Sequence, residues 1–346
     1  MVAELSALHM FVRGGDLRET PDPVANSSLG AELDRDTAAG GYRIRRIFRA
    51  DPDYPGELSP LAKPAVGAAE GDVLTAIDGV ALLTVPDPGV LLRAKAGKQV
   101  LLTIRETKSG KTRDAIAVPL PGAAADLRYD DWETTRRLEV EEKGKGDLGY
   151  VHLRAMGGSD YSDWARNFYP VYRRKGLIVD VRHNRGGNID SWILEKLMRR
   201  AWFYWQPRVG APIWNMQYAF RGPVVVLVDE WTASDGEAFA EGFRRLGLGK
   251  VIGTRTWGGE IWLSSNNVLV DKGIATAAES GVFGPEGQWL IEGRGVEPDV
   301  IVDNLPRATF DGKDAQLEAA IAYLRETLQK QPVEEPKPPR YPDKSR

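Results

Sequence analysis

The sequence predicts an α/β protein that carries a separate β-rich module. From about residue 126, continuous apolar runs alternate with amphipathic segments, which is typical of a buried, largely parallel sheet between helices. Between residues 42 and 120, short strand-like segments are instead separated by turns rich in Gly and Pro. The amphipathic segment 314–330 ends the α/β part, and the Pro- and charge-rich residues 331–346 are expected to be disordered.

The β-rich module follows a connector. Residues 1–28 contain the end of a helix and then a stretch rich in Gly, Pro and Ser. The predicted strands of the module are 42–49, 71–79, 98–106 and 114–120, and a short helix is predicted at 89–97. These elements place the module at residues 29–121.

The α/β part, residues 122–330, repeats one strand–helix pattern three times. A strand at 148–156 precedes a helix at 160–175, which Pro170 bends or divides. The strands at 176–184 and 222–230 precede helices that begin near Asp190 and Ser234. Because open α/β sheets bind ligands beyond the carboxyl ends of their strands, residues that follow these strands are candidates for a functional site.

Composition excludes several classes of protein. The net charge of −3 offers no basic surface for nucleic acid, and no apolar run reaches the ~18 residues of a membrane span. The first residues lack a signal peptide, so a cytoplasmic protein without membrane or nucleic-acid partners is expected. The absence of cysteine excludes disulfides, thiolate zinc sites and a cysteine nucleophile. No metal-binding motif is present, and no cofactor is expected.

Ser234 has two interpretations. Ser234 and Glu237 have the S-x-x-E spacing of a capping box, which is common at helix starts. Ser234 also lies just past the end of a predicted parallel strand, where a nucleophile would meet a ligand. The spacing alone favours the cap.

Two further features bear on that choice. Gly186 and Gly187 follow the neighbouring strand, and they predict either a tight turn or an oxyanion hole made of backbone N–H groups. A serine nucleophile also needs a base, and the chain offers three histidines, His9, His152 and His183. The spacing of the residues does not choose among them.

A resemblance supports the enzymatic interpretation. The segments GLIVDVRHNRGGNIDSWILEKLM, VVVLVDEWTASDGEAFAEGFRRLGLGKVIGTRTWGGE and WLIEGRGVEPDVIVD together resemble the tricorn protease family of serine peptidases. The similarity runs from about residue 4 to residue 328. It implies a crotonase- or ClpP-like catalytic core with an inserted PDZ domain, which would be the β-rich module, and peptides as substrates. Association with copies of itself is left open.

The resemblance also implies roles for single residues. It makes Ser234 the nucleophile, His9 the general base and Glu292 the acid that orients the base. The backbone N–H groups of Gly187 and Asp235 match the oxyanion hole. Related processing proteases use a lysine near the GTRT segment as the base, but this chain has Arg255 there, and arginine stays protonated.

Two positions depart from the archaeal branch of the family. Leu8 stands where that branch has a serine before the catalytic histidine, so the link from Glu292 to His9 is either direct or through water. Trp205 stands where that branch has an acidic residue in the S1 pocket, which predicts apolar rather than basic P1 residues. The competing hypothesis is an inactive peptidase-like scaffold that binds peptides through its PDZ-like module.

Overall fold

The computed structural model describes residues 9–16, 24–122, 125–263, 266–340 and 342–343. The chain divides into two compact units, each with its own buried core. The α/β unit comprises residues 1–17 and 139–346, and the β-rich unit comprises residues 18–138. The fold class predicted from the sequence is confirmed.

Five parallel strands form the sheet of the α/β unit, in the order β10–β11–β14–β15–β17. The strands are β10 (Leu148–His152), β11 (Gly176–Asp180), β14 (Val224–Val228), β15 (Gly249–Gly253) and β17 (Val300–Ile301). Every residue of the first three is buried, which explains their continuous apolar sequences. All five strands point the same way, so their carboxyl ends share one edge of the sheet.

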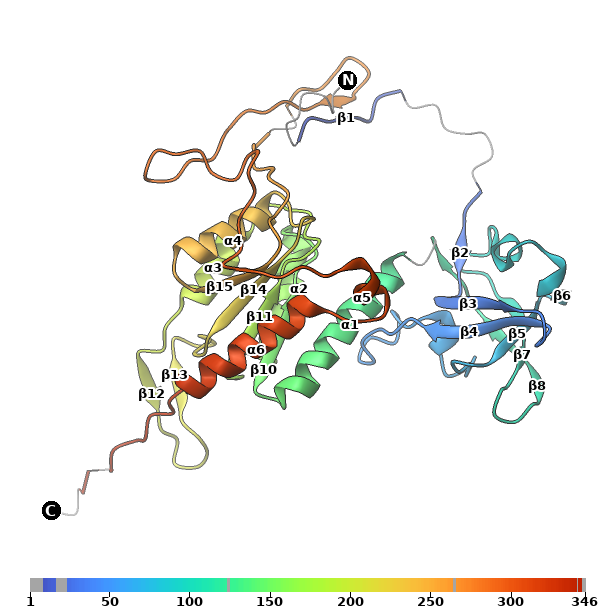
Figure 1. Cartoon of the computed structure of the whole chain (residues 1–346), viewed down its shortest axis with the longest axis horizontal. Helices are drawn as coiled ribbons and strands as arrows, with labels where there is room; N and C mark the ends of the chain where they lie inside the picture. The colour runs from blue at the N-terminus through green and yellow to red at the C-terminus, as the bar shows by residue number, and fades with distance from the viewer. Residues whose placement is uncertain (1–8, 17–23, 123–124, 264–265, 341, 344–346) are drawn as a thin grey trace. The chain divides into compact units, whose positions relative to one another are not determined.

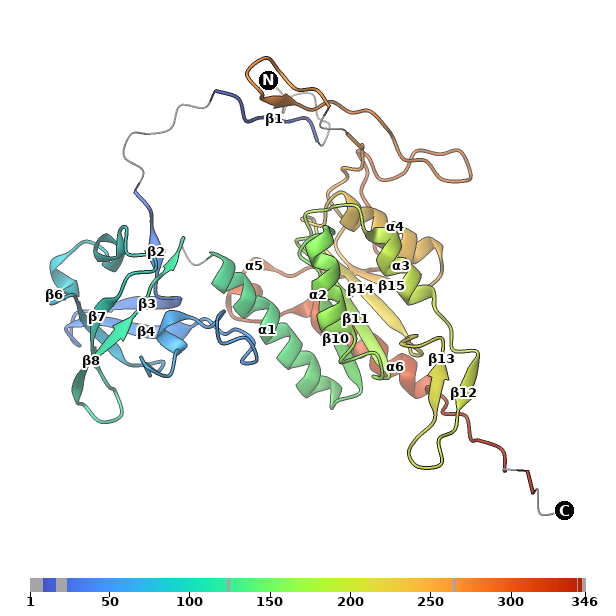
Figure 2. The same cartoon turned by 180° about the vertical axis from the view of Figure 1, so that it is seen from behind.

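Helices cover both faces of this sheet (Figures 1 and 2). The helices α2 (Gly158–Phe168), α3 (Asp190–Met198) and α4 (Asp235–Arg245) pack on one face, and α6 (Ala315–Lys330) and the end of α1 (Ala125–Gly144) pack on the other. Along β11, Leu177 and Val179 pack into the core beneath α2, α3 and α4, and Ile178 packs into the core on the opposite face. Successive side chains of a strand point to opposite faces of its sheet. The helix α2 ends at Phe168 and only turns and a bend follow up to residue 175, so the predicted helix over 160–175 stops before Pro170 and is not bent or divided by it.

A buried ion network ties the carboxyl end of β11 to α6. The guanidinium group of Arg182 lies 2.6 Å from Asp180 Oδ2 and 2.8 Å from Asp314 Oδ1, and its side chain is 3% exposed. Asp314 caps α6, since its side chain accepts the N–H of Leu317. Burial alone would raise the pKa of the Asp314 carboxyl, but the Arg182 charge beside it holds that pKa well below its usual range.

Three small elements complete the α/β unit. The strand β1 (Val12–Arg13) pairs antiparallel with β16 (Ile274–Ala275), which joins the N-terminal segment to a distant part of the chain. The strands β12 (Phe203–Trp205) and β13 (Ile213–Asn215) form a ribbon after α3, and α5 (Pro306–Phe310) precedes α6. None of the helices in the described part of the chain is long and apolar enough to cross a bilayer.

The β-rich unit is built on one antiparallel sheet in the order β3–β4–β5–β7–β8, with β6 beside β5. Its strands are β2 (Ser27–Ser28), β3 (Ala31–Asp36), β4 (Gly41–Ile47), β5 (Val73–Ile77), β6 (Val80–Ala81), β7 (Val100–Arg105), β8 (Thr112–Ala117) and β9 (Leu120–Pro121). The 3₁₀ helices are η2 (Pro60–Ala62), η3 (Leu82–Thr84) and η4 (Pro88–Leu92). The segment predicted as a helix at 89–97 is therefore the shorter η4, which begins at a proline.

Candidate active site

Ser234 lies at the turn between β14 and α4, at the carboxyl edge of the sheet. Its φ of 56° and ψ of −128° fall in a region that residues other than glycine rarely occupy, at a cost on the order of 1–3 kcal/mol. A strained turn between a strand and a helix is how several hydrolases present a serine hydroxyl at the edge of a sheet. The backbone at Ser234 therefore has a feature that a simple helix cap does not need.

The hydroxyl of Ser234 makes no capping hydrogen bond to the helix. The carboxylate of Glu237 does accept the Ser234 N–H at 3.1 Å, so the predicted S-x-x-E pattern does hold the helix start from the glutamate side. The hydroxyl oxygen of Ser234 instead lies 3.1 Å from Nε2 of His9. Ser234 thus both begins α4 and directs its hydroxyl at the imidazole of His9.

His9 has a defined tautomer in this arrangement. Its Nδ1 lies 2.6 Å from the carbonyl oxygen of Ile261. A carbonyl only accepts, so the ring proton resides on Nδ1 and the neutral Nε2 accepts the Ser234 O–H. The segment that carries His9 is attached through β1 and through Thr276, whose hydroxyl donates to the His9 carbonyl and accepts the Phe11 N–H.

The other two histidines have different partners. His152 is buried in β10, with Nδ1 2.9 Å from the carbonyl oxygen of Asp180. His183 lies with Nδ1 2.9 Å from Asp229 Oδ2. Burial alone would raise the pKa of Asp229, but the hydrogen bond and charge of His183 leave it below its ordinary value. Of the three candidates, His9 is the one whose ring meets the Ser234 hydroxyl.

Gly186 lies against Ser234, and Gly187 lies against the backbone of Met156. A Cβ added to Gly186 would lie 2.4 Å from the Cβ of Ser234 and 3.1 Å from the backbone nitrogen of Asp235, and the φ of Gly186 is +79°. A Cβ added to Gly187 would lie 2.0 Å from the carbonyl oxygen of Met156. Side chains are therefore excluded at both positions, which leaves this backbone close to the hydroxyl.

Asp235 has a side-chain role that sequence reasoning missed. Its Oδ2 accepts the N–H groups of Ile189 at 2.7 Å and Asp190 at 3.0 Å, so it ties the start of α3 to the start of α4. Its Oδ1 is buried and has no hydrogen-bond partner. Burial, together with the charge of Asp190, raises the pKa of Asp235 to about 7. The sequence had predicted only a backbone contribution from this residue.

Two glutamates anchor the segment 256–261. Glu237 accepts the Thr256 hydroxyl at 2.5 Å and the N–H groups of Gly258 at 2.7 Å and Gly259 at 2.9 Å. Glu292 Oε2 accepts the N–H of Glu260 at 2.7 Å. This segment carries the Ile261 carbonyl that holds His9. The only sequence signal for this role of Glu237 is the S-x-x-E spacing, which was interpreted as a cap.

The carboxylate of the predicted acid, Glu292, is therefore linked to His9 indirectly, through the backbone of Glu260 and Ile261. The atom within hydrogen-bonding distance of His9 Nδ1 is the Ile261 carbonyl oxygen. The Glu292 carboxylate accepts the N–H of the preceding residue, Glu260. The role of Glu292 as the orienting acid stays a prediction. Leu8, which bears on the same link, lies outside the described residues.

Trp205 is not brought beside Ser234 within one chain. The helix α3 begins at Asp190, next to Asp235, and leads away for nine residues, about 13 Å. Trp205 follows in β12, where its ring is 56% exposed and packs edge-on against Phe203. Figures 1 and 2 show this ribbon beyond the far end of α3. Its assignment to an S1 pocket stays a prediction.

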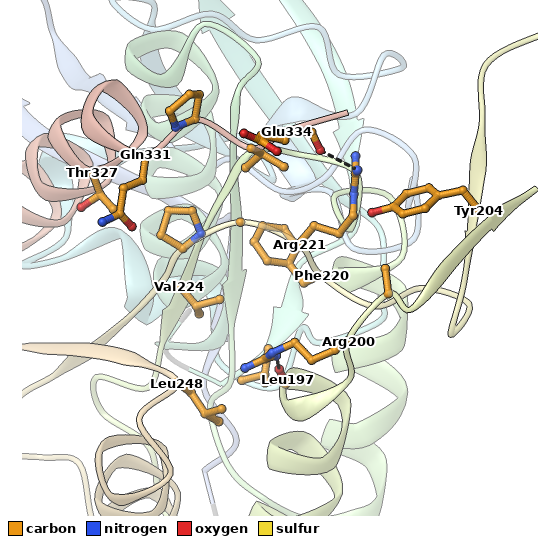
Figure 3. A pocket seen from close by; sticks show the side chains of 15 residues that line it. Leu197, Arg200, Tyr204, Phe220, Arg221, Val224, Leu248, Thr327, Gln331 and Glu334 are labelled. Carbon is orange, nitrogen blue, oxygen red and sulfur yellow. Dashed lines mark hydrogen bonds between the residues drawn. The ribbon is translucent and has the colours of Figure 1, made fainter. Parts of the chain in front are cut away.

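A cavity of about 510 Å³ lies at the opposite edge of the sheet (Figure 3). Its lining includes Val224, the first residue of β14, whereas Ser234 follows the last. Arg221 lies on this cavity and donates to the carbonyl oxygen of Glu334 at 3.4 Å, so residues predicted to be disordered form part of the wall. Among the described residues, no cluster of three or more His, Asp or Glu side chains is arranged to hold a metal ion.

Two family models match the chain. The model of peptidase family S41 matches residues 147–302, and the model of the tricorn protease PDZ domain matches residues 27–121. The first range contains Ser234 and the glycine pair, and the second contains the sheet of the β-rich unit.

Individual relatives extend this similarity over nearly the whole chain. Tricorn protease homolog 1 of Streptomyces coelicolor is 38% identical over 335 residues, which cover 96% of this chain and 31% of that protein. The tricorn protease of Thermoplasma acidophilum is 31% identical over 339 residues, which cover 98% of this chain and 31% of that protein. A crystal structure of the tricorn protease matches with a TM-score of 0.86 at 31% identity, over 93% of this chain and 31% of that one. This chain spans about a third of the length of these relatives.

Proposed function

This chain belongs to the tricorn proteases of peptidase family S41, and from that premise we propose that it hydrolyses peptide bonds through an acyl-enzyme on Ser234. The observation that carries the proposal is the distance of 3.1 Å between Ser234 Oγ and His9 Nε2. The Ile261 carbonyl also supports the proposal, because it accepts the Nδ1 proton of His9 and leaves Nε2 free to take the proton of Ser234.

The proposed reaction follows from this pair. Nε2 of His9 takes the proton as Ser234 Oγ attacks the carbonyl carbon of the peptide bond. The tetrahedral intermediate collapses, and His9 returns the proton to the amine that leaves. A water molecule, deprotonated by the same nitrogen, then attacks the acyl carbon. The bond from that carbon to Ser234 Oγ breaks, His9 returns the proton to Oγ, and the acid is released.

The surrounding backbone would stabilise the intermediate. We assign the oxyanion hole to the N–H groups of Gly187 and Asp235, because Gly186, the residue before Gly187, lies against Ser234 and Asp235 begins α4. Glu292 would orient the base indirectly, by fixing the Glu260 N–H and with it the Ile261 carbonyl. The positive charge that develops on His9 would then be stabilised at a distance rather than by direct contact.

Labelling with a fluorophosphonate tests the proposal. The wild-type chain is expected to form one covalent adduct, at Ser234, because this reagent reports an activated serine. His9→Ala is expected to slow labelling by at least about 100-fold, since general-base assistance is typically worth that much. Peptide mapping by mass spectrometry identifies the labelled residue.

The control is Ser159→Ala, which removes an exposed hydroxyl on α2 of the same unit. Labelling of this variant should match the wild type. An adduct at a residue other than Ser234, or equal labelling of the His9→Ala variant, would contradict the proposal.

A groove on the β-rich unit favours a second function, the binding of peptide ends. The groove, about 660 Å³, lies between the edge strand β3 and η4, and residues 26–29 close one end. There Ser27 Oγ donates to the Leu92 carbonyl, and the next residue, Arg93, also lines the groove. An edge strand pairs with an added peptide strand, and a guanidinium group suits a terminal carboxylate.

Peptide binding is expected to depend on that carboxylate. With Ser234→Ala in the full chain to prevent cleavage, a peptide with a free carboxyl terminus should bind about tenfold more tightly than its amide, because one charged hydrogen bond is lost. Fluorescence anisotropy measures both affinities. Arg93→Gln should remove the difference, while Arg35→Gln, on an exposed position outside the groove, should keep it. If the Ser234→Ala chain bound the free acid and the amide with equal affinity, recognition of a peptide carboxylate by this groove would be contradicted.

A further inference from the structure

Glu260 is a buried acid that the proposed reaction does not use. Its residue is 1% exposed, its Oε1 accepts the indole N–H of Trp262 at 2.9 Å, and its Oε2 has no hydrogen-bond partner. A buried carboxylate oxygen without a donor is costly, whereas a carboxylic acid is far less so. The site therefore suits the protonated form of this side chain.

The groups around Glu260 favour the same form. Negative charge near Glu260 comes from Asp235 and Glu237 on α4 and from Asp190 on α3. The hydrogen bond from the Trp262 N–H has the opposite effect, because it stabilises the ionised carboxylate. Burial first, and then these charges, raise the pKa of Glu260 to about 8. Asp235 is also protonated in part near neutral pH, since its own pKa is raised to about 7.

Glu260 is placed where its charge reaches the base. Glu237 fixes the segment at Gly258 and Gly259, and Glu292 fixes the N–H of Glu260 itself. The next residue supplies the carbonyl on His9 Nδ1. An ionised Glu260 side chain must either stay buried among other carboxyl groups or leave its site, which adjoins the residue whose carbonyl contacts His9.

We propose that Glu260 is a positioning residue that works as a neutral carboxylic acid and keeps the Ile261 carbonyl on Nδ1 of His9. Loss of its proton releases the side chain and, with it, the tautomer and orientation that the base needs. The catalytic consequence rests on the proposed peptidase function. The contact between Ile261 and His9 does not, so it provides an independent measurement.

Kinetics over a range of pH test the catalytic consequence. In the wild type, kcat for a fluorogenic peptide is expected to fall about tenfold between about pH 7.5 and pH 9, with little change in KM. Glu260→Gln mimics the neutral acid and should keep kcat within about twofold over that range. Glu260→Met, which also carries no charge, serves if the Gln variant does not fold. Glu230→Gln, an exposed carboxylate after β14, is the control and should keep the wild-type decline.

Proton NMR of the His9 ring tests the contact without any substrate. With only three histidines, ¹⁵N-labelled imidazole signals are assigned by single substitutions. The low-field Nδ1–H signal of His9 should be lost in the wild type as the pH rises through about 8 and should persist in the Gln variant. A signal with the same pH dependence in both proteins overturns the proposal.

The two measurements separate the two hypotheses. A chain that hydrolyses no peptide but shows the expected NMR difference disproves the peptidase function and supports the positioning role. A wild-type alkaline decline that the Gln variant retains disproves the positioning role and leaves the peptidase function intact.

Discussion

Ser234→Ala is expected to lower kcat for peptide hydrolysis by about 10⁴- to 10⁶-fold, the range typical for loss of a serine nucleophile. Folding should be nearly unaffected, because the hydroxyl makes no capping bond and the Glu237 contact is to the backbone N–H, which alanine retains. The free energy of unfolding should change by less than about 1 kcal/mol. Single-turnover kinetics and calorimetry measure the two effects.

The opposite pair of results would favour the cap. A serine that only caps a helix would cost about 1 kcal/mol of stability when replaced by alanine and would leave turnover unchanged. Ser159→Ala controls for the loss of a hydroxyl in the same unit. Residual turnover above about 1% of the wild type, shown to come from this protein, would exclude Ser234 as the nucleophile.

Arg182→Met is expected to destabilise the α/β unit by about 3–5 kcal/mol, because it leaves the buried carboxylates of Asp180 and Asp314 without their cation. Urea unfolding at neutral pH measures the loss. The effect should shrink in acid, because the lowered pKa of Asp314 gives stability that is present above its unfolded pKa and is lost as the pH falls through the folded value.

Arg307→Met is the matched control, since that arginine pairs with Asp311 on the surface and its side chain is 82% exposed. Its loss should cost less than about 1 kcal/mol. Replacing Asp180 and Asp314 by Asn in the Arg182→Met background should restore part of the stability, because no buried charge then remains. Equal losses in the two single variants would show that the buried network contributes no more than a surface pair.

The sheet of the α/β unit was predictable, and parts of its surroundings were not. The strands β10, β11 and β14 are continuous apolar runs, so burial on both faces could be inferred from sequence. Helix α1 was missed because its twenty residues are mostly charged and its apolar positions are few. The strand β3 was missed because its sequence, AELDRD, is mostly charged, which an edge strand tolerates but which gives no apolar strand pattern.

The site was predictable to different degrees. The edge position of Ser234 and the glycine pair follows from the strand–helix pattern. His9 is 225 residues from Ser234, so only the family resemblance could connect them. The roles of Ile261 and Glu260 had no local signal, because a backbone carbonyl has no sequence signature and the burial of one acid depends on residues from α3 and α4.

The pairing of β1 with β16 has a consequence for how the proposed activity would be lost. Ser234 follows β14, the central strand of the sheet, whereas the described contacts of the His9 segment include its pairing with β16, the hydrogen bonds of Thr276 and the Ile261 carbonyl. A segment at the periphery of a fold detaches at a much smaller free energy than the one that unfolds a core. Mild warming or dilute denaturant should therefore release His9, the proposed base, while the sheet stays intact. Under the proposed function, activity and foldedness would be separate equilibria, and activity would be lost first.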